Sequence, residues 1–142
     1  YSLSKDLIEF EITRNADYES IDETLRIVQS IKDSGFHIII DDFGSNQANI
    51  YLFSSVNFDV MKLDKLLVQK LLDNEKAYSL ILSLVETCHK LGVSIVAKGV
   101  ENIELLNVIE EMNIDEIQGY LFSGPVSLDE FTTKYIEKKE KS

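Results

Sequence analysis

The chain has 142 residues, of which 44% are hydrophobic, and a formal net charge of −11 at pH 7. This length is typical of one domain with a sizeable core, and the charge argues against binding to nucleic acid or to an anionic membrane. A single cysteine, Cys88, excludes an internal disulfide and fits a reducing compartment. No apolar run reaches membrane-spanning length. The composition therefore predicts a cytoplasmic protein without direct membrane contact.

The N-terminal part of the chain predicts a strand, a helix and a second strand. Residues 7–12 alternate apolar and acidic side chains, as in a half-buried strand. An amphipathic helix is expected from Ile21, ending at Gly35. Residues 36–40 are all apolar or aromatic apart from one histidine, which favours a strand buried on both faces of a parallel sheet.

The same alternation of helices and strands continues to the C-terminus. Strands and helices joined by short connections predict parallel βαβ units with right-handed crossovers. In chain order the pattern predicts a short helix within 45–55, strands at 58–63, 93–97 and 114–120, and helices at 77–91, 103–109 and 127–136.

A polar residue ends each of the five predicted strands. These residues are Glu11, Asp41, Lys62, Lys98 and Gln118. Because the carboxyl ends of parallel strands meet at one edge of a sheet, we expect these side chains to form a site there.

The second strand ends in two adjacent carboxylates, Asp41 and Asp42. Neighbouring residues on a strand point to opposite faces, so both can reach one ion only if the backbone bends, and we expect Gly44 to permit the bend. The alternative is that Asp42 caps a following helix and holds no ion. We also expect His37 to be a hydrogen-bonded core residue and His89 to face solvent.

These strand ends resemble the EAL family, the cyclic di-GMP phosphodiesterases of bacterial signalling. The resemblance implies an α/β fold, a partial TIM (β/α)8-type barrel of about five parallel strands with flanking helices. Residues 1–142 would then be the C-terminal portion of a single EAL domain, without the upstream strands that hold the Glu-Ala-Leu motif. The matching motifs are Glu11-Ile12-Thr13, Asp41-Asp42-Phe43-Gly44, Lys62-Leu63-Asp64, Val96-Ala97-Lys98-Gly99-Val100-Glu101 and Gln118-Gly119-Tyr120-Leu121-Phe122-Ser123-Gly124-Pro125.

The resemblance also implies the chemistry of the site. In the family, two divalent metals, Mg2+ or Mn2+, activate a water that hydrolyses cyclic di-GMP to linear pGpG. Hard oxygen ligands suit these ions, and a two-metal site stabilises the attacking and leaving oxygens together. By position, Glu11, Asp41 and Asp42 match the metal ligands, Lys62 the lysine that holds the water, and Glu101 and Gln118 the groups that orient the cluster.

Three departures from the family pattern argue against activity. Lys98 replaces a glutamate that is the leading candidate for general base in the family. A unit charge about 5 Å from a dication interacts with it by roughly 6–7 kcal/mol at an effective dielectric of 20, and the lysine turns this attraction into repulsion. Arg14 replaces a glutamate that anchors the loop after the paired aspartates, and that loop, residues 44–49, has lost its second glycine. We therefore expect metal binding to be lost, with Lys98 pairing with Asp41, Asp42 or Glu101 instead.

Three functions remain open from the sequence. The first is a degenerate EAL domain that no longer hydrolyses cyclic di-GMP and acts as a nucleotide receptor or a protein-interaction module. The second is an active phosphodiesterase, with Glu101 or a group outside this chain as base. The third is a structural or dimerisation module. We expect the partners to be cyclic di-GMP and either a second copy of the chain or neighbouring signalling domains.

Overall fold

The computed structural model describes residues 4–13, 21–45 and 48–136, which form one parallel sheet with flanking helices. The sheet has five strands in the order β1-β2-β3-β4-β5, so each strand lies beside its neighbour in sequence. All four strand pairs are parallel. The strands are β1 (Glu9–Ile12), β2 (His37–Phe43), β3 (Val60–Leu63), β4 (Ser94–Lys98) and β5 (Glu116–Gln118).

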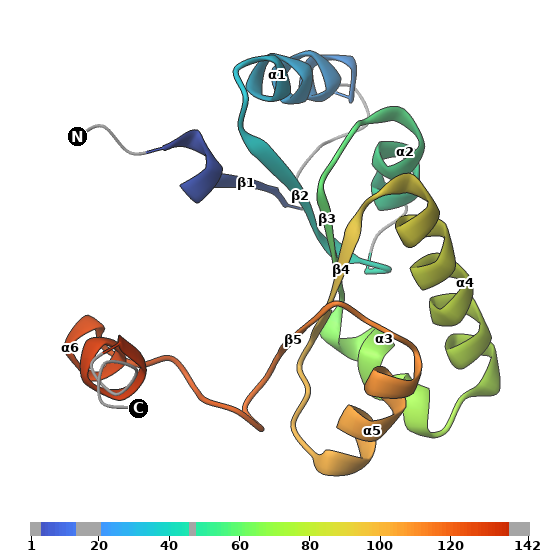
Figure 1. The fold of residues 1–142 in the computed structure, drawn as a ribbon. Coiled ribbons are helices and arrows are strands. Elements are labelled where there is room, and N and C mark those ends of the chain that lie inside the picture. Colours follow the sequence, from blue (N-terminus) through green and yellow to red (C-terminus); the bar gives the residue numbers. More distant parts are fainter. Residues whose placement is uncertain (1–3, 14–20, 46–47, 137–142) are drawn as a thin grey trace.

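Helices connect the strands and cover one face of the sheet. Figure 1 shows α1, α2 and α4 on one side of the strands and α6 on the other. Within the described part of the chain, none of the helices has the length and apolar content that crossing a membrane requires. The helices are α1 (Ile21–Asp33), α2 (Ala48–Ser55), α3 (Lys65–Gln69), α4 (Glu75–Leu91), α5 (Ile103–Glu111) and α6 (Leu128–Phe131), with short turns η1 (Lys5–Leu7), η3 (Lys70–Leu72) and η4 (Thr132–Ile136).

The core lies between the sheet and the helices. Alternate strand residues such as Ile38, Ile40 and Met61 are fully buried and pack against the helices, because successive side chains of a strand point to opposite faces. Cys88 of α4 belongs to this core, and burial together with the charge of Asp115 raises its pKa to about 11. The thiol is therefore an inert packing group.

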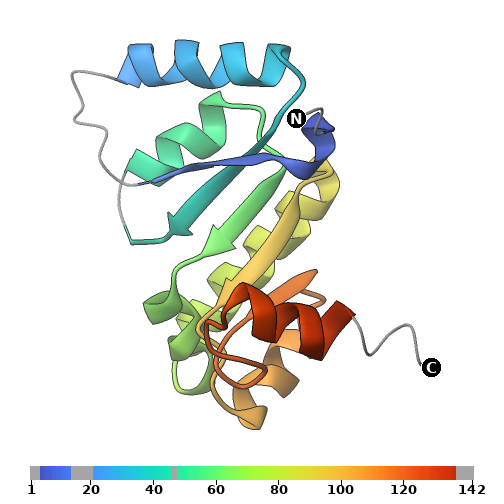
Figure 2. The same cartoon turned by 90° about the vertical axis from the view of Figure 1, so that its left-hand side faces the viewer.

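The opposite face of the sheet is concave and partly open. Figure 2 views the molecule from this side, with α6 in front of the strands. A hollow of about 300 Å³ on the sheet includes Ile39, Val60 and Val96 of three neighbouring strands. Lys62 and Gln118, two of the polar residues at the strand ends, also line this hollow.

Most of the predicted elements are present, with three differences. The first strand begins at Glu9 because residues Lys5–Leu7 form a 3-10 turn. The last strand is only three residues long, Glu116–Gln118. Residues Lys65–Leu72 form the short helices α3 and η3, which the sequence analysis missed. A five-residue helix spans too few turns to show a clear apolar period.

Candidate functional site

The two adjacent aspartates reach the same side of the sheet because the strand itself is irregular. The pairing of β2 with β3 shifts register between Ile40 and Phe43. Asp42 lies in this bulge with a φ of 51°, a left-handed conformation that aspartate tolerates better than most residues. We expected Gly44 alone to permit the bend. Gly44 does have a φ of 100°, but the backbone already turns at Asp42. The helix-cap alternative is wrong, since Asp42 belongs to β2 and α2 begins only at Ala48.

Lys98, the last residue of β4, lies against this pair of carboxylates. Its Nζ donates to Oδ1 of Asp41 and to Oδ1 of Asp42, both at 2.8 Å. Burial of the ammonium opposes its protonation, but the hydrogen bonds to the two carboxylates and their charges outweigh this and raise the pKa of Lys98 above its ordinary value. Lys98 is therefore a cation at neutral pH, and its expected pairing with Asp41 and Asp42 is confirmed.

Glu11 and Lys62 form a second pair across the sheet. The Lys62 ammonium on β3 donates to the Glu11 carboxylate on β1, over the intervening strand β2. The Lys62 side chain is 20% exposed and that of Glu11 is 43% exposed. The structure therefore places the predicted metal ligand Glu11 next to the predicted water-holding lysine.

Glu101 forms a third pair, but with a lysine that the sequence analysis did not single out. Lys65 Nζ, from α3, lies 2.5 Å from Oε1 of Glu101, so the alternative pairing of Glu101 with Lys98 is wrong. The sequence contained an indication that a helix begins near Lys65, because aspartate is a preferred helix-capping residue and precedes it at position 64. In the structure, Asp64 caps α3 by accepting a hydrogen bond from Leu66 N. Lys65 then lies in the first turn, at the same edge as the other charged residues.

Glycine at position 99 allows the Lys65 side chain to lie close to the end of β4. Gly99 has a φ of 76°, and a Cβ there would overlap with the Lys65 side chain. The amides of Gly99 and Val100 both donate to the carbonyl of Gln118, which ties the ends of β4 and β5 together. A left-handed glycine is thus required where two strand ends and a helix meet.

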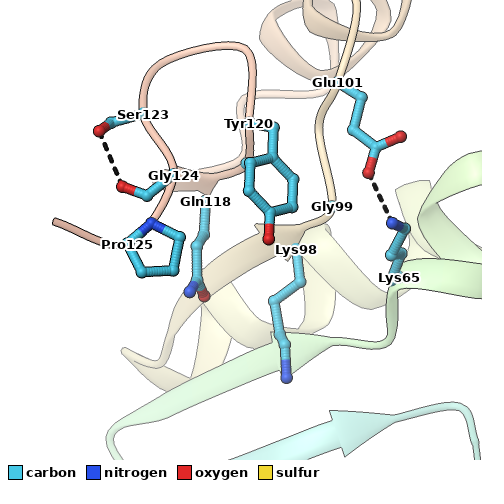
Figure 3. A pocket seen from close by; sticks show the side chains of 10 residues that line it. Lys65, Lys98, Gly99, Glu101, Gln118, Tyr120, Ser123, Gly124 and Pro125 are labelled. Atoms are coloured by element: carbon cyan, nitrogen blue, oxygen red, sulfur yellow. Dashed lines mark hydrogen bonds and ion pairs between the residues drawn. The ribbon is translucent and has the colours of Figure 1, made fainter.

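A cavity of about 480 Å³ at the carboxyl edge of the sheet is lined by Lys65, Lys98, Gly99, Glu101 and Gln118, but not by Glu11, Asp41, Asp42 or Lys62. Figure 3 shows Lys65 and Glu101 facing each other on one side and Gln118 and Pro125 on the other, with Lys98 extending toward the strands below. Gln118, the last predicted site residue, lines this cavity from the end of β5.

A divalent metal does not fit the side chains as they are arranged. Asp41 and Asp42 already contact the ammonium of Lys98, and Glu11 contacts Lys62. Nowhere in residues 4–13, 21–45 and 48–136 do three acid, histidine or cysteine side chains form a group that could hold an ion. Carboxylate oxygens have the right chemistry for Mg2+ or Mn2+, but the Oδ1 atoms of Asp41 and Asp42 contact an ammonium.

The two histidines lie at the opposite, amino edge of the sheet, and the expectations about them have different outcomes. His37 is not a core residue, because its side chain is 42% exposed and its Nδ1 lies 3.5 Å from Asp59 Oδ1. His89 faces solvent as expected, with its ring beside Asp115. The replacement at Arg14, and residues 46–47 of the altered loop, lie outside the described residues.

Comparison with known proteins identifies the family. The EAL domain family matches residues 1–125. The chain belongs to the EAL domain family. Its five parallel strands and flanking helices are accordingly part of the TIM-barrel-like fold of EAL domains, as the resemblance in the sequence implied.

One curated protein and two solved structures illustrate the similarity to other EAL domains. Cyclic di-GMP phosphodiesterase NbdA of Pseudomonas aeruginosa is 28% identical over 90% of this chain and 17% of its own length. The EAL domain protein of Listeria monocytogenes is 34% identical, with a TM-score of 0.76 over 89% of this chain and 50% of that chain. BlrP1 of Klebsiella pneumoniae, solved with manganese and cyclic di-GMP, is 28% identical, with a TM-score of 0.79 over 87% of this chain and 31% of that chain.

The chain therefore spans half of the Listeria chain and about a sixth of the curated relative. The manganese complex indicates that EAL domains use divalent metals. Against that background, the lysine between the paired aspartates of this EAL domain is the feature that needs a functional explanation.

Proposed function

We propose that this EAL domain works in cyclic di-GMP signalling without hydrolysing the nucleotide, as a receptor that binds it. The observation that carries the proposal is the position of the Lys98 ammonium, 2.8 Å from both Asp41 and Asp42. A metal-dependent hydrolase needs these carboxylates for its cations, and here a fixed positive charge of the protein occupies them.

Two further groups that the family resemblance assigns to catalysis, Lys62 and Glu101, are held in ion pairs. Lys62, which the family resemblance assigns to the catalytic water, donates to Glu11. Glu101, the alternative base, lies against Lys65. Groups held in ion pairs are poorly placed to activate water, because a general base must lie within hydrogen-bond reach of the proton that it abstracts.

The cavity beside Lys98 has the chemistry of a nucleotide site. Lys65 and Lys98 line the cavity, and each ammonium has at least one N–H donor beyond those that contact its carboxylate partners, which suits the oxygens of a phosphodiester. Tyr120, which is 68% exposed, offers an aromatic ring on which a base can stack. Gln118 offers an amide that can hydrogen-bond to the polar edge of the base.

We also infer that the chain is the C-terminal portion of a longer EAL domain. The inference is supported by the share of the Listeria chain that it covers, 50%, and by the sheet order, in which β1 and β5 are edge strands. Such edges pair readily with further strands, so self-association of the isolated chain, or contact with neighbouring signalling domains, is part of the proposal.

Two measurements on the full-length protein that contains this chain test the function. Incubation with cyclic di-GMP and Mn2+, followed by chromatography, is expected to yield no pGpG. Calorimetric titration with cyclic di-GMP in EDTA is expected to give saturable binding, which Tyr120→Ala weakens about tenfold by removing a stacking ring. Phe122→Ala is the matched control, because Phe122 is also exposed, at 56%, but does not line the cavity.

The alternatives predict other results. Formation of pGpG that is lost in Asp41→Asn would establish an active phosphodiesterase and overturn the proposal. Absence of both turnover and saturable binding would leave the structural or dimerisation module as the function.

A further inference from the structure

Three lysines contact the four acids Glu11, Asp41, Asp42 and Glu101 at the carboxyl edge of the sheet and offset three of their four charges. Each lysine comes from a different element than the acid it contacts, so the pairs cross between strands and join α3 to the end of β4. Pairs of this kind need no added cation to offset the repulsion between carboxylates. The pairs are Lys62 with Glu11, Lys98 with Asp41 and Asp42, and Lys65 with Glu101.

We propose that Lys98 is a built-in counter-ion that takes the place of a divalent metal, so that the ammonium and a metal exclude each other at Asp41 and Asp42. The inference rests on the proposed non-hydrolytic function and adds that a single side chain keeps the metal out. Nζ bridges one oxygen of each carboxylate at 2.8 Å. An ion that bridged the same two oxygens from the same side, at about 2.1 Å, would overlap with the ammonium.

The fold holds Lys98 in this position. It is the last residue of β4, directly opposite Gln118 in register, and its side chain is only 23% exposed. Asp42 reaches the same ammonium because of its left-handed backbone. The lysine is thus a partly buried member of the cluster, unlike a surface side chain that moves aside without cost.

The neighbouring acids do not offer a metal an alternative site. Glu11 is held by Lys62 and Glu101 by Lys65. Among the side chains that the structure describes, no group of three metal-ligating residues remains. Removing the charge at residue 98 should therefore be sufficient to let a cation bind at the two aspartates, and removing a neighbouring charge should not.

The experiment compares two matched variants of the full chain, Lys98→Met and Lys65→Met, with MnCl2 alone as the probe. Methionine keeps the length and the apolar stem of lysine and removes the charge. In wild type, the melting temperature is expected to be the same in EDTA and in millimolar Mn2+. Lys98→Met is expected to melt lower in EDTA, because two carboxylates repel each other, and to recover with Mn2+ in a saturable way.

Calorimetry is expected to show a gain in Mn2+ affinity of at least about tenfold for Lys98→Met over wild type. Lys65→Met is expected to leave Mn2+ binding as in wild type, because Lys65 lies against Glu101 and not against the paired aspartates. If Lys98→Met does not fold in EDTA, Lys98→Gln provides the second neutral variant for the same titration.

Two results would overturn the inference. One is wild-type Mn2+ binding as tight as that of the neutral variants, and the other is a Mn2+ response in Lys65→Met equal to that in Lys98→Met. Both are measured without nucleotide, whereas the proposed function is tested by pGpG formation and by cyclic di-GMP binding in EDTA. Failure of the metal inference is therefore distinct from failure of the receptor proposal.

Discussion

The two edges of the sheet both place acids beside cations, but with different consequences. At the amino edge, Asp59 accepts a hydrogen bond from the backbone N–H of Ile38 at 2.8 Å and so joins the start of β3 to β2. At the carboxyl edge, Asp41 and Asp42 contact the ammonium of Lys98. A carboxylate that accepts a hydrogen bond from the backbone holds neighbouring strands in register. A carboxylate that is paired with a side-chain ammonium can exchange that partner when a ligand binds or when the lysine is substituted.

The amino edge repeats its arrangement two strands further along the sheet. Asp115, just before β5, accepts from the N–H of Ile95 in β4 at 2.8 Å, as Asp59 does for β2. Each acid also meets a cationic or imidazole side chain from the end of a helix, Lys32 of α1 for Asp59 and His89 of α4 for Asp115. Because this hydrogen bond from a strand N–H to an aspartate occurs twice in the same sheet, we assign it a structural role.

At the amino edge, positive φ values occur at the ends of helices, as at Gly92 after α4, whereas at the carboxyl edge one occurs inside a strand. Asp42 and Gly99 both have positive φ, and the register of β2 against β3 shifts beside Asp42. Strained backbone that the surrounding structure holds in place is found at functional sites. We therefore expect the amino edge to contribute mainly to stability and the carboxyl edge mainly to function.

The largest effect is expected at the amino edge. Asp59→Ala should lower the free energy of unfolding by about 3 kcal/mol, because it leaves the Ile38 N–H and the Lys32 ammonium without their carboxylate. Urea denaturation measures the loss. Asp73→Ala, at an exposed acid after η3, is the control and should cost less than about 0.5 kcal/mol. If both variants lost the same free energy of unfolding, Asp59 would contribute no more to stability than an ordinary exposed acid.

Two glycines on either side of β4, Gly92 before the strand and Gly99 after it, separate the cost of backbone strain from the cost of a close contact. Gly92→Ala should cost about 1 kcal/mol, because its φ of 71° disfavours a side chain but nothing lies within 4 Å of an added Cβ. Gly99→Ala should cost about 2 kcal/mol, since its φ of 76° is similar and its Cβ would also overlap with Lys65. Thermal unfolding of both variants checks this, and equal costs would contradict the contact.

The amino edge should also give stability a dependence on acid pH. Burial opposes ionisation of Asp59, but hydrogen bonds from Lys32 and Ile38 outweigh it and lower the pKa of Asp59 below its ordinary value. A carboxyl with a lowered folded-state pKa adds stability above its unfolded pKa of about 3.9, and this is lost as the pH falls through the folded value. The difference in unfolding free energy between wild type and Asp59→Asn should thus be constant near neutral pH and shrink below about pH 4. A difference that stays unchanged down to pH 2 would show that ionisation of Asp59 is irrelevant.

The smallest effect is expected for the exposed pair at the carboxyl edge. Lys65→Met should change the free energy of unfolding by less than about 1 kcal/mol, because the Lys65 and Glu101 side chains are 46% and 42% exposed and water screens their attraction. Chemical denaturation at low and high salt checks this. A loss comparable to that of Asp59→Ala would mean that the carboxyl edge also holds the fold together.

Most of the fold was predictable because its signals are local. Continuous apolar runs marked β2 and β4, and a one-sided apolar stripe marked α4. Glycine at position 92 ended α4 in a left-handed conformation, as its sequence position indicated. The short helix α3 was missed because five residues give no full apolar period, and only its capping Asp64 announced it.

The site was predictable in its members but only partly in its pairing. Polar residues at five strand ends were expected to meet at one edge, because parallel strands place their carboxyl ends together. That Lys98 would meet the paired aspartates was one of several options, and Lys65 as the partner of Glu101 was not foreseen. Which acid each lysine contacts depends on the twist and register of the sheet.

The sequence by itself determined the alternation of strands and helices and the set of charged residues at the strand ends, because hydrophobic period and turn residues act over a few positions. Only the tertiary structure decided that an ammonium bridges the two aspartates, since Lys98 lies 57 and 56 residues from them along the chain. It also decided that Asp42 turns back to share that ammonium with Asp41, through a left-handed backbone beside the shift in strand register. Such a geometry depends on how β2, β3 and β4 stack in the sheet, and no local pattern specifies it.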